Sequence, residues 1–192
     1  MKRIVLTFGL ISGAILAAMM VATIPFVDQI GFDRSMIIGY TTMVLAFLLV
    51  FFGIRSYRET IGKGQISFLR ALGVGLLIVT VATLCYVVTW EIIYHNFFPD
   101  FGDKYLAYGI EQVRTSGKSP QEIENEIEYM RRMMGLYNSS VLFSAAVTFL
   151  EPLPVGLPVS FISALILRKR RREQQDLQDV HNAVKETSVN PV

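Results

Sequence analysis

Charged residues are scarce in this chain: Asp, Glu, Lys and Arg make up 18% of its 192 residues, against about 25% in ordinary soluble domains. One cysteine, Cys85, cannot form an internal disulfide, and with only two histidines, His95 and His181, no spacing typical of a metal site occurs. The sequence also lacks a glycine-rich phosphate loop, a His-Glu-x-x-His motif and a Gly-x-Ser-x-Gly motif. These absences favour a non-enzymatic protein without a cofactor or metal. The absence of a basic face outside the C-terminal flank argues against nucleic-acid binding.

Four long apolar stretches dominate the sequence. They run over Ile4–Val27, Ser35–Ile54, Ala71–Trp90 and Val141–Leu167. A helix needs about 20 mostly apolar residues to cross a hydrocarbon core of about 30 Å, and each stretch meets that length. We expect the third helix to continue to Phe98, because nothing breaks it before Pro99.

The predicted fold is therefore all-α: a polytopic bundle of four transmembrane helices with an extracytoplasmic helical segment between the third and the fourth. The transmembrane domain is predicted over residues 1–172, followed by a partly disordered cytoplasmic tail, 173–192. Within that domain, the four spans are predicted at 4–27, 35–54, 71–98 and 141–167. The outer helical segment is predicted at 99–140.

Basic residues predict the orientation, because Lys and Arg collect in cytoplasmic loops. Lys2 and Arg3 precede the first span, four basic residues lie in 55–70, and Arg168–Arg172 follow the fourth. The 28–34 turn has one basic residue, and 99–140 has five against seven acidic ones. We therefore expect both termini in the cytoplasm of a bacterial inner membrane. A cleaved signal peptide is the alternative for the first span, but its apolar run exceeds the usual 7–15 residues.

The outer segment contains a signal for a helix start. Ser119 is a candidate N-cap, Pro120 suits the first helical position, and Glu122 completes a capping box. An apolar stripe follows at Ile123, Ile127, Met130 and Met134. This amphipathic helix can lie on the bilayer, pack on other helices or bind a partner, and its acidic start favours the last two uses. It can also continue into the fourth span with a bend at Gly135. Lys104–Arg114 is a second short helix candidate.

Small residues recur at four-residue spacing in two spans, a pattern that allows close helix packing in membranes. They are Gly9, Gly13 and Ala17 in the first span, and Gly156, Ser160 and Ala164 in the fourth. We expect these stripes to pack inside one chain, with packing between copies as the alternative.

The fourth span contains three prolines, Pro152, Pro154 and Pro158, next to Glu151. Each proline removes a backbone donor and obstructs the helix, so we expect a kinked or partly unwound span. An intramembrane acid is a candidate functional residue. At 1.5 Å per residue, Glu151 lies roughly 25 Å above the cytoplasmic edge and Glu91 of the third span roughly 31 Å above it.

Two interpretations of these acids stay open. In the first, Glu91 only reaches the outer interface and Glu151 is a neutral structural acid at the kink; in the second, they form a proton or cation site. We expect Glu151 to be protonated near neutral pH and hydrogen bonded to Thr148, Tyr86 or Glu91. The five basic residues Arg168, Lys169, Arg170, Arg171 and Arg172 act first as a cytoplasmic anchor and attract anionic lipid.

The chain resembles the small bacterial four-span membrane proteins of domain of unknown function 4199, over roughly residues 4–170. The likeness is carried by four short segments: Phe8-Gly9-Leu10-Ile11-Ser12-Gly13, Gly64-Gln65-Ile66-Ser67-Phe68, Ala71-Leu72-Gly73-Val74-Gly75 and Phe98-Pro99-Asp100-Phe101. The resemblance implies no assigned activity and no catalytic residues.

The sequence leaves several functions open. The first is a non-enzymatic integral membrane protein that acts through helix or loop contacts with a second copy or another membrane protein. The second is a small oligomeric transporter or channel subunit that uses the broken fourth helix and Glu151. A membrane-embedded enzyme is the weakest alternative.

Overall fold

The computed structural model describes residues 1–169, and over these residues the protein is all-α, without a β-strand. The predicted tail, with Arg170, Arg171 and Arg172, lies outside the described residues. Helices and one 3₁₀ turn follow one another in this order: α1 (Lys2–Thr23), η1 (Ile24–Phe26), α2 (Val27–Ile30), α3 (Phe32–Thr60), α4 (Phe68–Asn96), α5 (Phe101–Arg114), α6 (Pro120–Ser139), α7 (Val141–Leu150) and α8 (Leu153–Leu167).

Four segments are long and apolar enough to cross a membrane. They are Lys2–Ile30, Phe32–Thr60, Phe68–Asn96 and Val141–Leu167. The first two extend beyond the predicted spans at both ends. The third ends two residues before Phe98. Together they confirm a polytopic bundle of four membrane-spanning helices.

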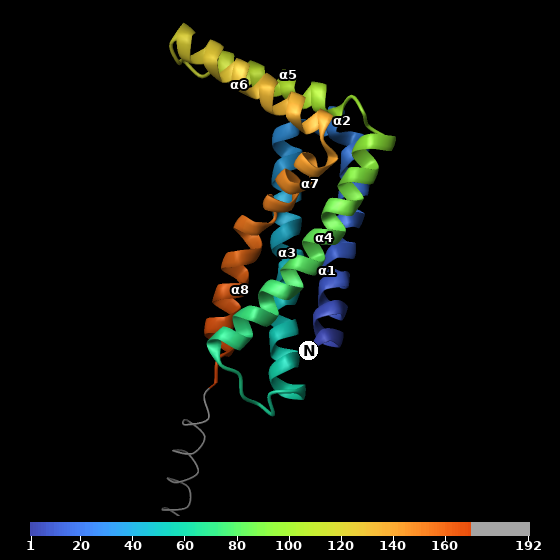
Figure 1. Ribbon diagram of the computed structural model, residues 1–192, viewed down its shortest axis with the longest axis vertical. Coiled ribbons are helices and arrows are strands. Elements are labelled where there is room, and N and C mark those ends of the chain that lie inside the picture. The colour runs from blue at the N-terminus through green and yellow to red at the C-terminus, as the bar shows by residue number, and fades with distance from the viewer. Residues whose placement is uncertain (170–192) are drawn as a thin grey trace, which may run out of the picture.

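The spans alternate in direction, so their connections gather at two ends of the bundle (Figure 1). The N-terminus, the α3–α4 loop and the end of α8 lie together at one end, and α2, α5 and α6 lie at the other. We call these the basic end and the outer end, because Lys2, Arg55, Arg58 and Arg70 flank the first. A short antiparallel bridge closes the basic end, where Ile66 and Lys169 exchange backbone hydrogen bonds of 3.2 and 3.0 Å.

The small-residue stripes pack inside the chain. A Cβ atom at Gly9 would lie 2.6 Å from Cβ of Val81, and one at Gly13 would lie 2.6 Å from Cβ of Cys85, so α1 lies directly against α4. On α8, Gly156 approaches Val79 of α4 in the same way. Farther along α8, Ser160 and Ala164 are fully buried, whereas Ala17 on α1 is half-buried. Close approach inside one chain therefore accounts for Gly9, Gly13 and Gly156.

Outside the spans, α5 and α6 form a hairpin that projects to one side of the outer end (Figure 1). The predicted capping box of Ser119 and Glu122 is present at the start of α6. Met130 packs over Gly109 and Met134 lies next to Gly102, so the apolar stripe of α6 contacts α5. The alternative of a bend at Gly135 does not occur: α6 continues to Ser139, and the chain turns at Ser140, whose extended backbone and side chain cap α7.

Candidate functional site

The fourth span is divided into two helices by its prolines. Helix α7 ends at Leu150, Glu151 is its C-cap, and α8 begins after Pro152. The Glu151 amide bonds back only to the Thr148 carbonyl, at 3.3 Å, because no helical hydrogen bond can come from Pro152. Pro154 occupies the first turn of α8, where a missing donor costs little, and Pro158 lies inside α8.

The break changes which helices the fourth span contacts. Below it, α8 packs on both α3 and α4; above it, α7 packs on α4 and α6 and has no comparable contact with α3. The outer halves of α3 and α7 are therefore separated. The α5–α6 hairpin lies over the space that this separation leaves.

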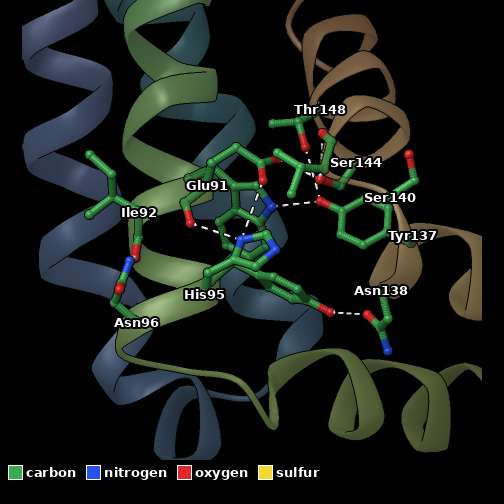
Figure 2. Close-up of polar contacts among 12 residues, drawn as sticks. Glu91, Ile92, His95, Asn96, Tyr137, Asn138, Ser140, Ser144 and Thr148 are labelled. Atoms are coloured by element: carbon green, nitrogen blue, oxygen red, sulfur yellow. Dashed lines mark hydrogen bonds and ion pairs between the residues drawn. The ribbon is translucent and has the colours of Figure 1, made fainter.

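One face of α7 presents polar groups to α4, and we call this contact the polar seam. Its α7 residues are Ser144, Thr148 and Glu151, which share a face because they are spaced by four and three residues. Figure 2 shows Glu91 of α4 directed toward Ser144, whose hydroxyl donates to Oε1 of Glu91 at 2.7 Å. His95 Nδ1 lies 3.4 Å from the other carboxylate oxygen. The Glu91 side chain is 16% exposed and is packed against α7.

Tyr137, near the end of α6, links the hairpin to the seam. Its hydroxyl accepts a 2.6 Å hydrogen bond from Trp90 Nε1 and lies 3.0 Å from Oγ1 of Thr148 (Figure 2). Burial raises the pKa of Tyr137, so its hydroxyl keeps its proton at neutral pH. One turn along α4, Tyr94 donates to Oδ1 of Asn138. The orientation of α6 is therefore fixed by hydrogen bonds to two aromatic residues of α4.

Glu151 is positioned at the inner end of the seam. Of the three partners considered from sequence, Tyr86 is the one that bonds it, by donating its hydroxyl to Oε2 at 3.0 Å. Glu91 and Glu151 thus have separate hydroxyl partners, Ser144 and Tyr86. The two acids do not share one site.

The separation of α3 from α7 contains a cavity of about 530 Å³, which we call the outer cavity. Its lining comes from α1, α3, α4, α5, α6 and α7, and it includes seven of the eight methionines and six of the eight tyrosines of the chain. The methionines are Met19, Met20, Met36, Met43, Met130, Met133 and Met134. Among residues 1–169, Glu151 is the only Asp or Glu in the lining, and no Lys, Arg or His of that range lines it. This volume is within the range of ligand pockets, about 300–1,000 Å³.

The exposed part of the lining shows where the outer cavity opens. Met36 and Tyr40 on α3 are 44% and 42% exposed, and Val147 on α7 is 40% exposed. Lining residues of the α5–α6 hairpin are exposed as well, with Tyr105 at 42% and Tyr129 at 62%, so the opening is bordered by α3, α7 and the hairpin.

Sequence reasoning found Glu151 and the proline break but missed the cavity. Its lining comes from segments far apart in the chain, and a methionine on an apolar helix looks like ordinary core. Trp90 and Tyr94, near the outer end of the third span, also line the outer cavity. The one available signal was the gathering of methionines near the outer helix ends.

Comparison with family models matches residues 7–169 to a family described as "Protein of unknown function (DUF4199)". No curated protein and no solved structure matches the chain.

Proposed function

Because the chain belongs to the DUF4199 family of proteins of unknown function, whose description assigns no activity, we propose a function from the geometry of the outer cavity. The protein is a non-enzymatic, multi-pass protein of the bacterial cytoplasmic membrane. It binds a small apolar molecule that enters the outer cavity from the lipid.

The observation that carries this proposal is the methionine lining. Methionine side chains are flexible and polarisable, and proteins use them at surfaces that accept varied apolar ligands. Here seven of eight lie around one cavity instead of being spread through the four spans. The buried core of the bundle is built mainly from Val, Ala and Ile, and Met43 is the one methionine among its residues that the structure describes. This segregation supports a binding role for the cavity beyond packing.

We propose that both termini face the cytoplasm, which puts the outer cavity in the outer leaflet. Support comes from the basic end, where the N-terminus, the α3–α4 loop and Lys169 meet. The test is a topology reporter fused after Gly117, at the tip of the α5–α6 hairpin. It should report an extracytoplasmic location, and a cytoplasmic location would overturn the orientation. At the basic end, Arg168 and Lys169 would attract anionic lipid by about 1 kcal/mol each.

Trp90 makes the cavity testable, because it is the only tryptophan of the chain and it lines the cavity. A brominated long-chain alcohol should quench Trp90 fluorescence saturably. Gly39 also lines the cavity, and a Cβ at that position meets nothing within 4 Å, so Gly39→Phe should fill the space and abolish the saturable phase.

The matched control is Gly73→Phe, because Gly73 of α4 has the same open surroundings but lies outside the cavity lining. It should leave the quenching unchanged. Linear quenching in the wild type, or equal quenching in all three proteins, would overturn the proposal.

We further propose that the protein acts through contacts of the α5–α6 hairpin with a second copy or another membrane protein. Support comes from its projection beyond the bundle, with Tyr129 62% exposed (Figure 1). A photo-crosslinker at Tyr129 should give a discrete adduct in native membranes. A crosslinker at Leu69, which is also exposed but lies at the basic end, should not. Equal adducts at both positions would contradict this contact.

A small transporter or channel subunit is the second candidate, favoured by the helix break at Glu151. Broken helices build substrate sites in transporters, but four spans would need an oligomer to form a path across the membrane. A defined oligomer on sizing in detergent, with substrate flux in liposomes that Glu151→Gln abolishes, would favour this candidate over simple binding. A monomer without flux would eliminate it.

A further inference from the structure

The outer cavity has one carboxyl group in a lining that is mostly apolar and aromatic, with a few serine and threonine hydroxyls. Glu151 contributes that group at the α7–α8 break, and among residues 1–169 Tyr86 is the only side chain that hydrogen bonds to it. Tyr86 engages Oε2 alone, which leaves Oε1 available to a ligand. Glu151 is exposed on the protein but lies within the fourth span, where a carboxylate without a cationic partner is costly. The lining residues that the structure describes include no Lys, Arg or His.

Aromatic residues of α3 and α4 line the cavity together with this carboxyl group. Tyr86 touches Glu151, Trp90 follows one turn along α4, and Tyr40 on α3 is close enough for electrostatic interaction with Glu151. The faces of Tyr and Trp rings attract cations, and aromatic cages with this property bind ammonium groups. A carboxylate beside such rings is therefore a suitable receptor for an organic cation.

We propose that the outer cavity binds a single-chain amphiphile with a primary ammonium head. Glu151 is its counter-ion, Tyr40 and Trp90 contact the head, and the methionines surround the apolar chain. This inference rests on the proposed function and adds the chemical class of the ligand. Phosphate-bearing lipid heads are disfavoured, because the lining offers them no Lys or Arg and presents a carboxylate instead.

Binding of the ammonium head exchanges the carboxyl proton of Glu151 for the bound cation. When the cavity is empty, the protonated, neutral form of Glu151 is favoured, because no cation is present to balance a carboxylate. When the ammonium group binds, the carboxyl proton leaves to water and the ammonium takes its place. One proton is released for each cation bound, and no net charge is added to the cavity.

The experiment compares two brominated probes of equal chain length, bromododecylammonium and bromododecanol, by saturable quenching of Trp90. In the wild-type protein the ammonium probe should bind about tenfold more tightly, since a hydrogen bond to a charged group is the stronger kind. Glu151→Gln should remove this preference while leaving the alcohol unaffected. Glu91→Gln is the matched control, because Glu91 is also an intramembrane acid but lies outside the cavity lining.

Each outcome separates the two proposals. If both probes bind the wild type saturably with equal affinity, or if Glu151→Gln keeps the preference for the ammonium, the ammonium inference is wrong and the cavity still binds apolar molecules. If neither probe gives saturable quenching in the wild type, the proposed function itself fails. The comparison within the wild type needs no variant to fold.

Discussion

Single glycine positions set how closely the spans approach one another. Gly9 and Gly13 allow α1 to lie on Val81 and Cys85 of α4, where any side chain would overlap an atom of the neighbouring helix. Gly73, in contrast, has open surroundings. The sequence alone predicts the stripe Gly9, Gly13 and Ala17, but it does not identify the partner helix, because the spacing is the same for every candidate neighbour.

Gly9→Ala should destabilise the bundle by about 1–3 kcal/mol, since the added methyl group overpacks the α1–α4 contact. Gly73→Ala is the control and should be neutral or slightly stabilising. Thermal unfolding in one detergent measures both. Equal unfolding midpoints for the two variants would contradict the close contact at Gly9.

Tyr137→Phe should destabilise the junction between α6 and α4 by about 1–3 kcal/mol, because it leaves Trp90 Nε1 and the Thr148 hydroxyl without their partner. The emission of Trp90 should shift as its indole loses this hydrogen bond. Tyr129→Phe, at an exposed position of the same helix, should change neither quantity. An unchanged Trp90 emission in Tyr137→Phe would argue against the hydrogen bond.

At the scale of elements, some helix ends were predictable and others were not. The start of α6 followed from Ser119, Pro120 and Glu122, because a capping box is a local signal. The start of the fourth span at Val141 was predicted from its apolar run, and α7 begins there; the cap that Ser140 provides was not predicted, because a serine within an otherwise helical run is a weak stop signal. The break at Pro152 was expected from the missing backbone donors, but the direction in which α7 leaves α3 depends on contacts with α4 and α6.

Lys104 joins elements that are far apart in the chain. Its ammonium lies 2.7 Å from Asp28 at α2 and 3.0 Å from Asp100 at the start of α5. Its hydrogen bond to Asp28, with a further one to Asp100, raises the pKa of Lys104, and Lys104 lowers the pKa of the Asp100 carboxyl. The stabilising contribution of Asp100 to the folded state is therefore present above its unfolded-state pKa. It is lost as pH falls through the lowered folded-state pKa. The Lys104 contribution is present below its unfolded-state pKa and is lost as pH rises through the raised folded-state pKa.

The contact between Lys104 and Asp100 at the start of α5 should therefore be constant between roughly pH 5 and pH 9 and weaken outside that window. Hydrogen exchange of α5 amides, corrected for intrinsic rates, measures it. Protection should fall at acidic pH in the wild type, and Lys104→Met should show low protection with little pH dependence. A wild-type profile that stays flat down to pH 3 would contradict the role of this contact.

At the scale of the whole molecule, the four-span bundle was predictable because apolar length and basic flanks are properties of contiguous sequence. The outer cavity was not predictable, because it arises where α7 diverges from α3 under the α5–α6 hairpin. Its residues are separated by more than a hundred positions, from Leu16 to Glu151. Glu151 and the prolines were identified from sequence, but the cavity that Glu151 lines is formed by the packing of helices far apart in the chain.

Pro152→Ala combined with Pro154→Ala should restore backbone donors and straighten the fourth span, bringing α7 toward α3. Spin labels at Met36 and Val147 should then move closer together, and quenching of Trp90 by the brominated alcohol should weaken. The same labels with Pro99→Ala, outside the span, should keep the wild-type distance. An unchanged distance in the double variant would show that the prolines do not hold the cavity open.

The central claim is that the outer cavity is a binding site for a membrane-dissolved molecule. The most direct measurement is a crystal structure of the full chain grown with bromododecanol, with the bromine located by its anomalous scattering. We predict a bromine peak between α3, α4 and α7, beside Met43 or Trp90, that disappears in Gly39→Phe. Bromine peaks confined to the lipid-facing surface of the spans would contradict the claim.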